Sequence, residues 1–222
     1  MNRAEWRIHM NAQDCLQILR DVKDVTFATV DGKGRPRARV IDVMLVEPGK
    51  MYFCTARGKD FYQEILKNGC VAVTGMNREF QMVRLEGKAE KLPEQKKWID
   101  KIFEENPVMN DVYPGDSRYI LEPFCIDNGQ IEFFDLGKSP IERYSFSLAE
   151  EPVREKGFLI TDACIGCGKC SRNCPQKCIV PGEKTTERAS TTYIIRQEHC
   201  LHCGLCAENC PVQAIIRRGE QK

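Results

Sequence analysis

The sequence of 222 residues has no long hydrophobic run and no export signal. A membrane-spanning helix needs about 18 consecutive apolar residues, and no stretch reaches that length. The opening residues, MNRAEWRIHMNAQD, lack the apolar core of a signal peptide. We therefore expect a cytoplasmic protein without a membrane partner.

Two common functional patterns are missing as well. A nicotinamide site needs GxGxxG between a strand and a helix, whereas DGKGRP at 31–36 has the composition of a hairpin turn and GCGKC at 166–170 belongs to a cysteine-rich run. No acid–base dyad or nucleophilic triad stands out among the other residues. The sequence therefore supports neither a nicotinamide site nor side-chain acid–base catalysis.

Cysteine, by contrast, is abundant, with 13 in the chain. CIGCGKCSRNCP at 164–175 and CLHCGLCAENCP at 200–211 align without a gap. Each copy has the spacing C-x2-C-x2-C-x3-C before a proline, in which three close cysteines hold one cubane and the fourth crosses to the other cubane. The repeat predicts two 4Fe-4S clusters in half-sites related by a pseudo-two-fold axis.

The crossing rule assigns four ligands to each cluster. Cys164, Cys167, Cys170 and Cys210 are expected to hold the first cluster, and Cys200, Cys203, Cys206 and Cys174 the second. Structural zinc and disulfides are the alternatives, but zinc favours separate CxxC pairs and disulfides suit small secreted domains.

Cys178 stands where Ala214 stands in the other copy, and we interpret it as a small buried side chain beneath a cluster. Four isolated cysteines are expected in the core in reduced form: Cys15, Cys54, Cys70 and Cys125.

The charge of the cysteine-rich segment argues against a nucleic-acid partner. Residues 158–222 hold nine Lys or Arg and six Asp or Glu, a formal charge of +3. An oxidised 4Fe-4S core with four thiolates is a unit of charge 2−, so two clusters bring the segment to about −1. No nucleic-acid recognition motif is present, and we expect no such partner.

The first 145 or so residues predict antiparallel strands with inserted helices. Helices are expected at 11–22, 59–69 and 93–106, and strands at 25–31, 37–47, 51–55, 70–76, 80–92 and 121–137. Asn128-Gly129 divides the last of these and is typical of a two-residue hairpin. The pattern favours the α+β class and a small closed barrel over a parallel sheet.

Three stretches carry a family resemblance. FATVDGKGRPRARVI at 27–41, MYFCTARGKDFYQEILKNG at 51–69 and MVRLEGKAEKL at 82–92 resemble the pyridoxamine 5'-phosphate oxidase-like split barrel. The likeness spans roughly residues 10–137. It implies an antiparallel split barrel with inserted helices, a homodimer and a bound FMN.

The resemblance also implies flavin-binding residues, namely Arg39, Val40, Ile41, Thr55, Arg57, Lys59 and Gln81. Arg39 and Lys59 would reach the phosphate, with Thr55 and Arg57 near it or near the ribityl chain. Backbone groups of Val40 and Ile41 would lie near the ring, and Gln81 would approach the ring across the dimer. A guanidinium, an ammonium and a helix N-terminus together suit a phosphate of about −1.5 to −2 charges.

Within that family, the vitamin-making oxidases have a lysine where this chain has Met44. The sequence therefore shows little of the site with which those oxidases bind a substrate phosphate, and this argues against the vitamin-making reaction for this chain. The catalytic residues and the substrate stay unassigned.

The order of the two parts suggests a function. We expect an FMN-binding split barrel at 1–148 and a ferredoxin-like domain with two 4Fe-4S clusters at 158–222, with the polar residues 138–157 as a connector. One-electron carriers beside a cofactor that accepts one or two electrons indicate a flavin-dependent reductase of a small molecule, fed by an external low-potential donor such as a ferredoxin. The alternatives are a module that relays electrons to a partner protein and a redox or oxygen sensor.

Overall fold

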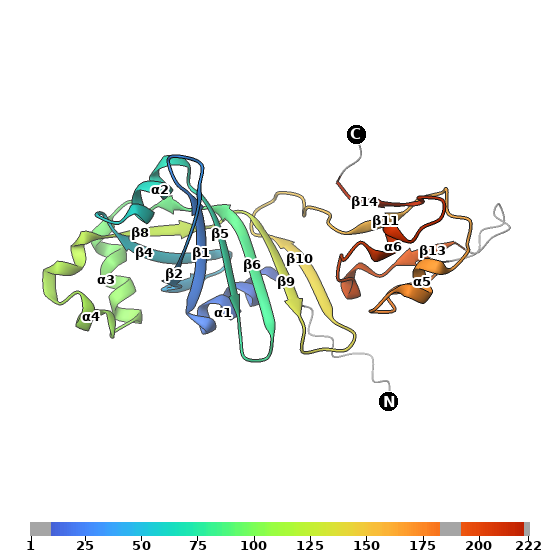
Figure 1. Ribbon diagram of the computed structural model, residues 1–222. Helices are drawn as coiled ribbons and strands as arrows, with labels where there is room; N and C mark the ends of the chain where they lie inside the picture. Colours follow the sequence, from blue (N-terminus) through green and yellow to red (C-terminus); the bar gives the residue numbers. More distant parts are fainter. Residues whose placement is uncertain (1–9, 183–191, 220–222) are drawn as a thin grey trace, which may run out of the picture. The chain divides into compact units, whose positions relative to one another are not determined.

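A computed structural model describes residues 10–182 and 192–219 of the chain. The chain divides into two compact units (Figure 1). The first is Met1–Phe133 with Ser145–Val153, and the second is Phe134–Tyr144 with Arg154–Lys222. The domain limits expected from the sequence, 1–148 and 158–222, stay predictions. No helix in the described part of the chain is long and apolar enough to cross a membrane.

Two sheets with antiparallel pairing organise the barrel. The six-stranded sheet has the order β10-β9-β6-β5-β1-β2, and the four-stranded sheet has the order β3-β4-β8-β7. The first contains β1 (Asp24–Val30), β2 (Pro36–Asp42), β5 (Cys70–Met76), β6 (Gln81–Lys88), β9 (Gln130–Asp135) and β10 (Glu142–Ser147). The second contains β3 (Leu45–Glu47), β4 (Lys50–Ala56), β7 (Glu90–Lys91) and β8 (Leu121–Ile126). The expected α+β class with an antiparallel split barrel is confirmed.

Two of the expected strands are in fact two strands each, because the chain changes sheets within them. Between β2 and β3, the Val43 N–H donates to Lys23 O while the next N–H, of Met44, donates to Tyr52 O in β4. Between β6 and β7, Ala89 is the single residue between the sheets. The predictions of continuous strands at 37–47 and 80–92 are therefore wrong at these corners, where a closing barrel bends its strands.

The turn at Asn128-Gly129 also differs from expectation. Strands β8 and β9 flank it as predicted, but they belong to different sheets, so the predicted hairpin is wrong. Gly129 has φ 123°, and a Cβ there would lie 2.2 Å from Glu86 O. Glycine is needed because the turn passes directly over the backbone of β6.

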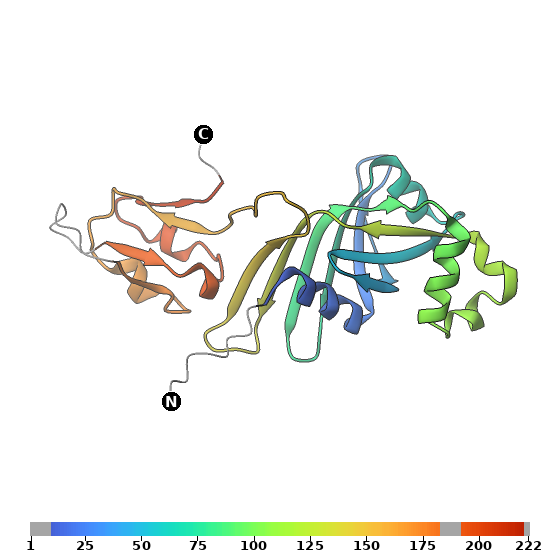
Figure 2. The ribbon, with the colours of Figure 1, turned by 180° about the vertical axis from the view of Figure 1, so that it is seen from behind.

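The three predicted helices are confirmed as α1 (Ala12–Val22), α2 (Asp60–Asn68) and α3 (Gln95–Glu105). Helix α1 begins with a capping box in which Asn11 and Asp14 exchange side-chain and backbone hydrogen bonds. It lies against β5 and β6 (Figure 2). A short helix α4 (Met109–Val112) and a 3-10 helix η1 (Gly115–Ile120) follow α3 and were not predicted.

The barrel core is built from aromatic rings of both sheets. Phe53 of β4 lies with its ring centroid 4.8 Å from that of Phe27 in β1 and 5.4 Å from that of Phe124 in β8. The next residue, Cys54, faces the other way and packs with Ile99 and Phe103 of α3. Strand β4 is thus buried on both faces, between the interior of the barrel and α3.

The second unit repeats its backbone. Helix α5 (Lys169–Asn173) and strand β12 (Ile179–Pro181) recur 36 residues later as α6 (Leu205–Glu208) and β14 (Ile215–Arg217). Strand β12 pairs with β13 (Tyr193–Ile195), β14 pairs with β11 (Phe158–Ile160), and η2 (Gln197–His199) precedes the second cysteine run. Left-handed residues also match in pairs, with Gly168 and Gly204 at φ 68° and 82°. The sequence repeat is therefore a structural repeat.

The interpretation of residues 138–157 as a plain connector is wrong for Glu142–Ser147, which form β10. This strand is an edge of the six-stranded sheet, and its burial pattern shows no alternation. Without a regular alternation of apolar and polar residues, the sequence carried no strand signal here.

Candidate functional site

The cysteines of the two runs gather in the second unit. An apolar cavity there is lined by all four cysteines expected to hold the second cluster, Cys174, Cys200, Cys203 and Cys206. Cys174 follows α5 in the first run, whereas the other three belong to the second run. The cavity thus has the crossed donor set that a 4Fe-4S cluster requires, and the residues present fit such a cluster.

The first set is less enclosed. Burial is the main cause that raises the pKa of Cys170, and Cys164 and Cys167 are further causes. Cys210 follows α6 and packs in the same apolar group as Cys170. Helices α5 and α6 lie against each other, which brings the ends of both runs together. Within the described residues, no three or more His, Cys, Asp or Glu side chains are placed closely enough to hold one single metal ion.

Backbone N–H groups point at the cysteine sulfurs in both copies. Gly166 N lies 3.5 Å from Cys164 Sγ, and His202 N lies 3.4 Å from Cys200 Sγ. Ala214 N lies 3.2 Å from Cys210 Sγ. Such donors stabilise thiolate charge and influence the reduction potential of a cluster.

Cys178 is buried, as interpreted from the sequence, and lies beside the second set. Its Sγ is 3.5 Å from Cys174 Sγ, and it lines the same cavity. A hydrogen bond between Cys178 and Cys200 lowers the pKa of Cys200 and raises that of Cys178. Cys178 therefore contacts two of the expected ligands.

The isolated cysteines are free thiols. Cys15, Cys54 and Cys125 are buried, and burial raises the pKa of each to about 12. Cys70 is exposed, so its expected place in the core is wrong. It begins β5, whose alternating burial puts Val71 and Val73 inside and Cys70 outside.

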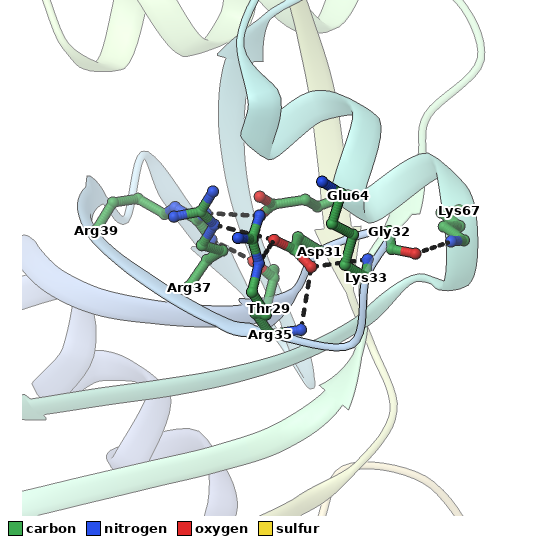
Figure 3. Close-up of polar contacts among 9 residues, drawn as sticks. All are labelled: Thr29, Asp31, Gly32, Lys33, Arg35, Arg37, Arg39, Glu64 and Lys67. Carbon is green, nitrogen blue, oxygen red and sulfur yellow. Dashed lines mark hydrogen bonds and ion pairs between the residues drawn. The ribbon is translucent and has the colours of Figure 1, made fainter.

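In the barrel, Arg39 of β2 reaches α2 (Figure 3). Its Nη2 lies 2.6 Å from Glu64 Oε2, its Nη1 donates to the Thr29 hydroxyl, and its guanidinium stacks over the ring of Phe61 at 4.6 Å. Glu64 is 7% exposed, so its charge is matched by Arg39 away from water. The predicted phosphate-binding arginine thus already has a carboxylate partner.

Arg57 has a similar partner. Its Nη1 lies 3.0 Å from Glu122 Oε1, and Lys91 Nζ lies 3.2 Å from the other oxygen of that carboxylate. Glu122 faces Thr55 across the β4–β8 pair. The Thr55 side chain is buried, and its hydroxyl has no hydrogen-bond partner in the described structure.

Lys59 stands directly before α2 and is exposed. Its backbone N–H donates to Ala56 O and its carbonyl accepts from the Tyr62 N–H, but its ammonium group makes no hydrogen bond or ion pair with the described residues. Helix α2 is nine residues long, and its first N–H groups lack a side-chain cap. Lys59, the α2 N-terminus and the buried Thr55 hydroxyl are donors of the kind that a phosphate needs, so this part of the barrel fits a flavin phosphate.

The other predicted flavin residues lie on strands. Val40 and Ile41 follow Arg39 on the edge strand β2, and Val40 is 64% exposed. Gln81 begins β6, and its side-chain oxygen accepts a hydrogen bond of 2.8 Å from Asn77. Gln81 is separated from β2 by strands β5 and β1, so one protomer does not bring it to Arg39.

A cleft of about 520 Å³ lies between the turn after β1 and helix α2. Asp31, Asp60 and Glu64 supply negative charge there, and Arg37 and Lys67 supply positive charge. Arg35 and Arg37 are turned toward Asp31 (Figure 3). The cleft is therefore lined by three acidic and two basic side chains, and none of the seven predicted flavin residues lines it.

Two family models match the chain. Residues 12–110 match pyridoxamine 5'-phosphate oxidase, and residues 163–214 match the 4Fe-4S dicluster domain. The resemblance drawn from the sequence is confirmed, with the oxidase model matching the barrel part and the dicluster model matching the cysteine-rich part. The pairing indicates electron transfer as the class of function.

Solved structures resemble the barrel part. A nimc/nima family protein of Clostridium acetobutylicum is 21% identical, with a TM-score of 0.52, and the match covers 60% of this chain and 91% of that chain. A protein of the same organism, related to general stress protein 26 of B. subtilis, is 15% identical over 60% of this chain and 94% of that chain, with a TM-score of 0.49. A pyridoxamine 5'-phosphate oxidase-related, FMN binding protein of Nostoc punctiforme is 15% identical over 63% of this chain and 94% of that chain, with a TM-score of 0.43. The first of these supports the fold. No curated protein matches the chain in sequence.

Sequence reasoning missed the acidic partners of the predicted cations. Glu64 lies 25 positions from Arg39, and Glu122 lies 65 positions from Arg57. A single-sequence pattern does not connect residues at such distances. The available signal was an acid in an apolar strand, since Glu122 is the one charged residue in the fully buried strand β8.

Proposed function

We propose that this protein is an iron–sulfur flavoprotein that reduces a small molecule with electrons from an external low-potential donor such as a ferredoxin. The observation that carries the proposal is the cavity in which Cys174 of the first run joins Cys200, Cys203 and Cys206 of the second. Cysteines from both runs that share one cavity, on the same chain as a flavoenzyme-type barrel, support the transfer of single electrons from the clusters to the flavin.

The cysteines of the second unit hold two 4Fe-4S clusters in this proposal. Gly168 and Gly204, in left-handed conformation, let the chain turn closely around each cluster before α5 and α6. The N–H groups of Gly166 and His202 stabilise sulfur charge. We further propose a cytoplasmic location, where the ligand thiols stay reduced.

The barrel holds FMN in this proposal. Lys59 and the α2 N-terminus bind the phosphate, and the Thr55 hydroxyl lies in the same region. Arg39 pairs with the Glu64 carboxylate and offers its remaining N–H donors to the phosphate, because a guanidinium has five N–H groups. We further propose a homodimer in which Val40 and Ile41 line the ring and Gln81 comes from the second copy.

When bound, each cluster would carry one electron and the flavin would accept one or two, so the three cofactors would supply a two-electron reduction from single electrons. The protein supplies binding, orientation and charge. No side-chain acid or base is assigned.

An anaerobic reductive titration of the purified full chain tests the proposal. One flavin and two clusters should take up about four electrons per chain, two in the flavin and one in each cluster. Uptake of four electrons with bleaching of both flavin and iron–sulfur bands supports the proposal. Uptake of two electrons, with no flavin released on denaturation, would refute the flavin part.

A substrate screen then separates a reductase from a relay. Reduced protein mixed with small-molecule acceptors should be reoxidised faster than the free donor oxidises in their presence. If only protein partners reoxidise it, the reductase is excluded and the protein is an electron relay.

A further inference from the structure

The two cysteine loops differ at one left-handed residue. Gly166 of the first loop has φ 71°, and its counterpart His202, 36 positions later, has φ 56°. Each residue donates its N–H to the sulfur of the first cysteine in its loop, Cys164 or Cys200. A histidine in this conformation is less stable than a glycine, so the side chain of His202 must bring a compensating interaction.

That interaction is with Arg143, which belongs to the same unit. Arg143 Nη1 lies 2.8 Å from His202 Nδ1, and the guanidinium stacks over the ring of Phe134 at 4.7 Å. Because a guanidinium only donates, Nδ1 is the acceptor and the ring proton is on Nε2.

A second histidine, His199, also contacts the segment that contains Arg143. His199 Nδ1 lies 2.8 Å from Ile141 O, and because a carbonyl only accepts, Nδ1 donates. Residues 141 and 143 therefore hold the two histidines on either side of Cys200. The first loop has Ala163 and Gly166 at the corresponding positions and cannot make either contact.

The arrangement brings a partly buried cation to one cluster site. Arg143 contacts the ring of His202, and the backbone N–H of His202 lies 3.4 Å from Cys200 Sγ. The first copy has its own cations, Lys169 and Arg172, but both are exposed on α5 and therefore more strongly screened by water and salt.

We infer that Arg143 makes the cluster of Cys200, Cys203, Cys206 and Cys174 the more easily reduced of the two, so that it receives the first electron. Reduction adds one negative charge to the cluster, and a fixed positive charge nearby stabilises the reduced form. The inference rests on the proposed function, because it requires both clusters.

The test is an anaerobic redox titration of the full chain, followed by the electron paramagnetic resonance of the reduced clusters. The wild type should show two separate midpoint potentials. Arg143→Gln should lower the higher midpoint alone, with the reduced-to-oxidised ratio of that cluster falling about tenfold at a fixed potential, or 59 mV for one electron. Arg143→Lys should keep the wild-type value because it keeps the charge.

His202→Gly provides a second variant that copies the first loop. It keeps the N–H donor to Cys200 and suits the left-handed backbone, so it should fold and lower the same midpoint by a smaller amount. Arg172→Gln is the matched control at an exposed arginine and should leave the higher midpoint unchanged.

The outcomes separate this inference from the proposed function. Iron analysis should give about eight iron atoms per wild-type chain, and a lower content in a fully reconstituted sample would refute the two clusters themselves. With eight irons present, the role of Arg143 is refuted if Arg143→Gln moves neither midpoint, moves both equally, or moves only the lower one.

Discussion

The two units bury different kinds of side chain. The first buries large apolar groups, with Phe27, Phe53 and Phe124 fully inaccessible to water. In the second, the central buried group is three cysteines, Cys170, Cys178 and Cys200, with Ile179 and Ile215. We therefore expect the first unit to fold on its hydrophobic core alone and the second unit to need its clusters in order to fold. The comparison teaches that the size of the apolar core decides whether a unit can fold before it binds its cofactor.

Loss of a cluster ligand should have the largest effect. Cys203→Ala should reduce the iron content by at least half and remove the amide protection of the second unit, while β1 and β4 stay protected, because the barrel core does not depend on iron. Hydrogen–deuterium exchange measured by mass spectrometry under anaerobic conditions checks this expectation.

Cys70→Ala is the matched control for that variant. Cys70 is an exposed cysteine of the barrel, so its removal should change neither iron content nor exchange. Wild-type protection of the second unit in Cys203→Ala, or release of flavin from that variant, would contradict the division of roles between the units.

A core substitution in the barrel gives the converse result. Phe53→Ala should reduce the free energy of unfolding of the barrel by about 3 to 5 kcal/mol, because it leaves a cavity between Phe27 and Phe124. Iron content should stay at the wild-type level. Urea unfolding followed by tryptophan fluorescence measures the change.

Phe80→Ala serves as the comparison, since the Phe80 side chain is 56% exposed. It should cost much less than Phe53→Ala. Equal losses in the two variants would mean that the ring cluster around Phe53 is not the source of barrel stability.

Lys59→Ala tests whether the barrel is already folded before it binds flavin. The variant should bind FMN about 10 to 100 times more weakly, because it loses a charge-assisted hydrogen bond worth about 1.5 to 3 kcal/mol. Its unfolding midpoint without flavin should match that of the wild type, since Lys59 is exposed. Quenching of flavin fluorescence on titration measures the affinity.

Lys67→Ala removes the same charge from the other end of α2, where Nζ lies 3.2 Å from Gly32 O. It should bind FMN as the wild type does. Similar weakening in both lysine variants would indicate a general charge effect and not a phosphate site at the α2 N-terminus.

The smallest expected effect is the acid dependence of the first hairpin. The backbone N–H of Arg35 is the main cause that lowers the pKa of Asp31 from 3.8 to about 2, assisted by the N–H of Lys33 and the Arg35 side chain. Because folding lowers the pKa of Asp31, the ionised carboxylate stabilises the folded barrel above pH 3.8. This stabilisation is lost as the pH falls toward 2.

Asp31→Asn should remove that part of the pH dependence. Unfolding midpoints of the barrel at pH 5 and near pH 2 should therefore differ less in the variant than in the wild type. An Asp31 carboxyl that titrates at its ordinary pKa in a nuclear magnetic resonance experiment would exclude this contribution.

Local patterns made much of the fold predictable. Helices α1, α2 and α3 follow from apolar spacing and from signals such as Asn11 at the start of α1. The cysteine spacing indicated the paired cluster sites, because three cysteines at intervals of three residues constrain one short loop. Each of these features is encoded within about a dozen neighbouring residues, and the sequence alone carried them.

The changes of sheet at Val43 and Ala89 were decided by closure of the barrel, which no local window contains. The same holds for the turn at Gly129, which is not a hairpin because its backbone lies over β6. Tertiary structure alone paired Arg39 with Glu64 and brought Arg143 to His202, since these partners are 25 and 59 positions apart. Sequence determined which groups are available for chemistry, and the folded chain decided which charges they meet, because electrostatic partners are set by distance in space.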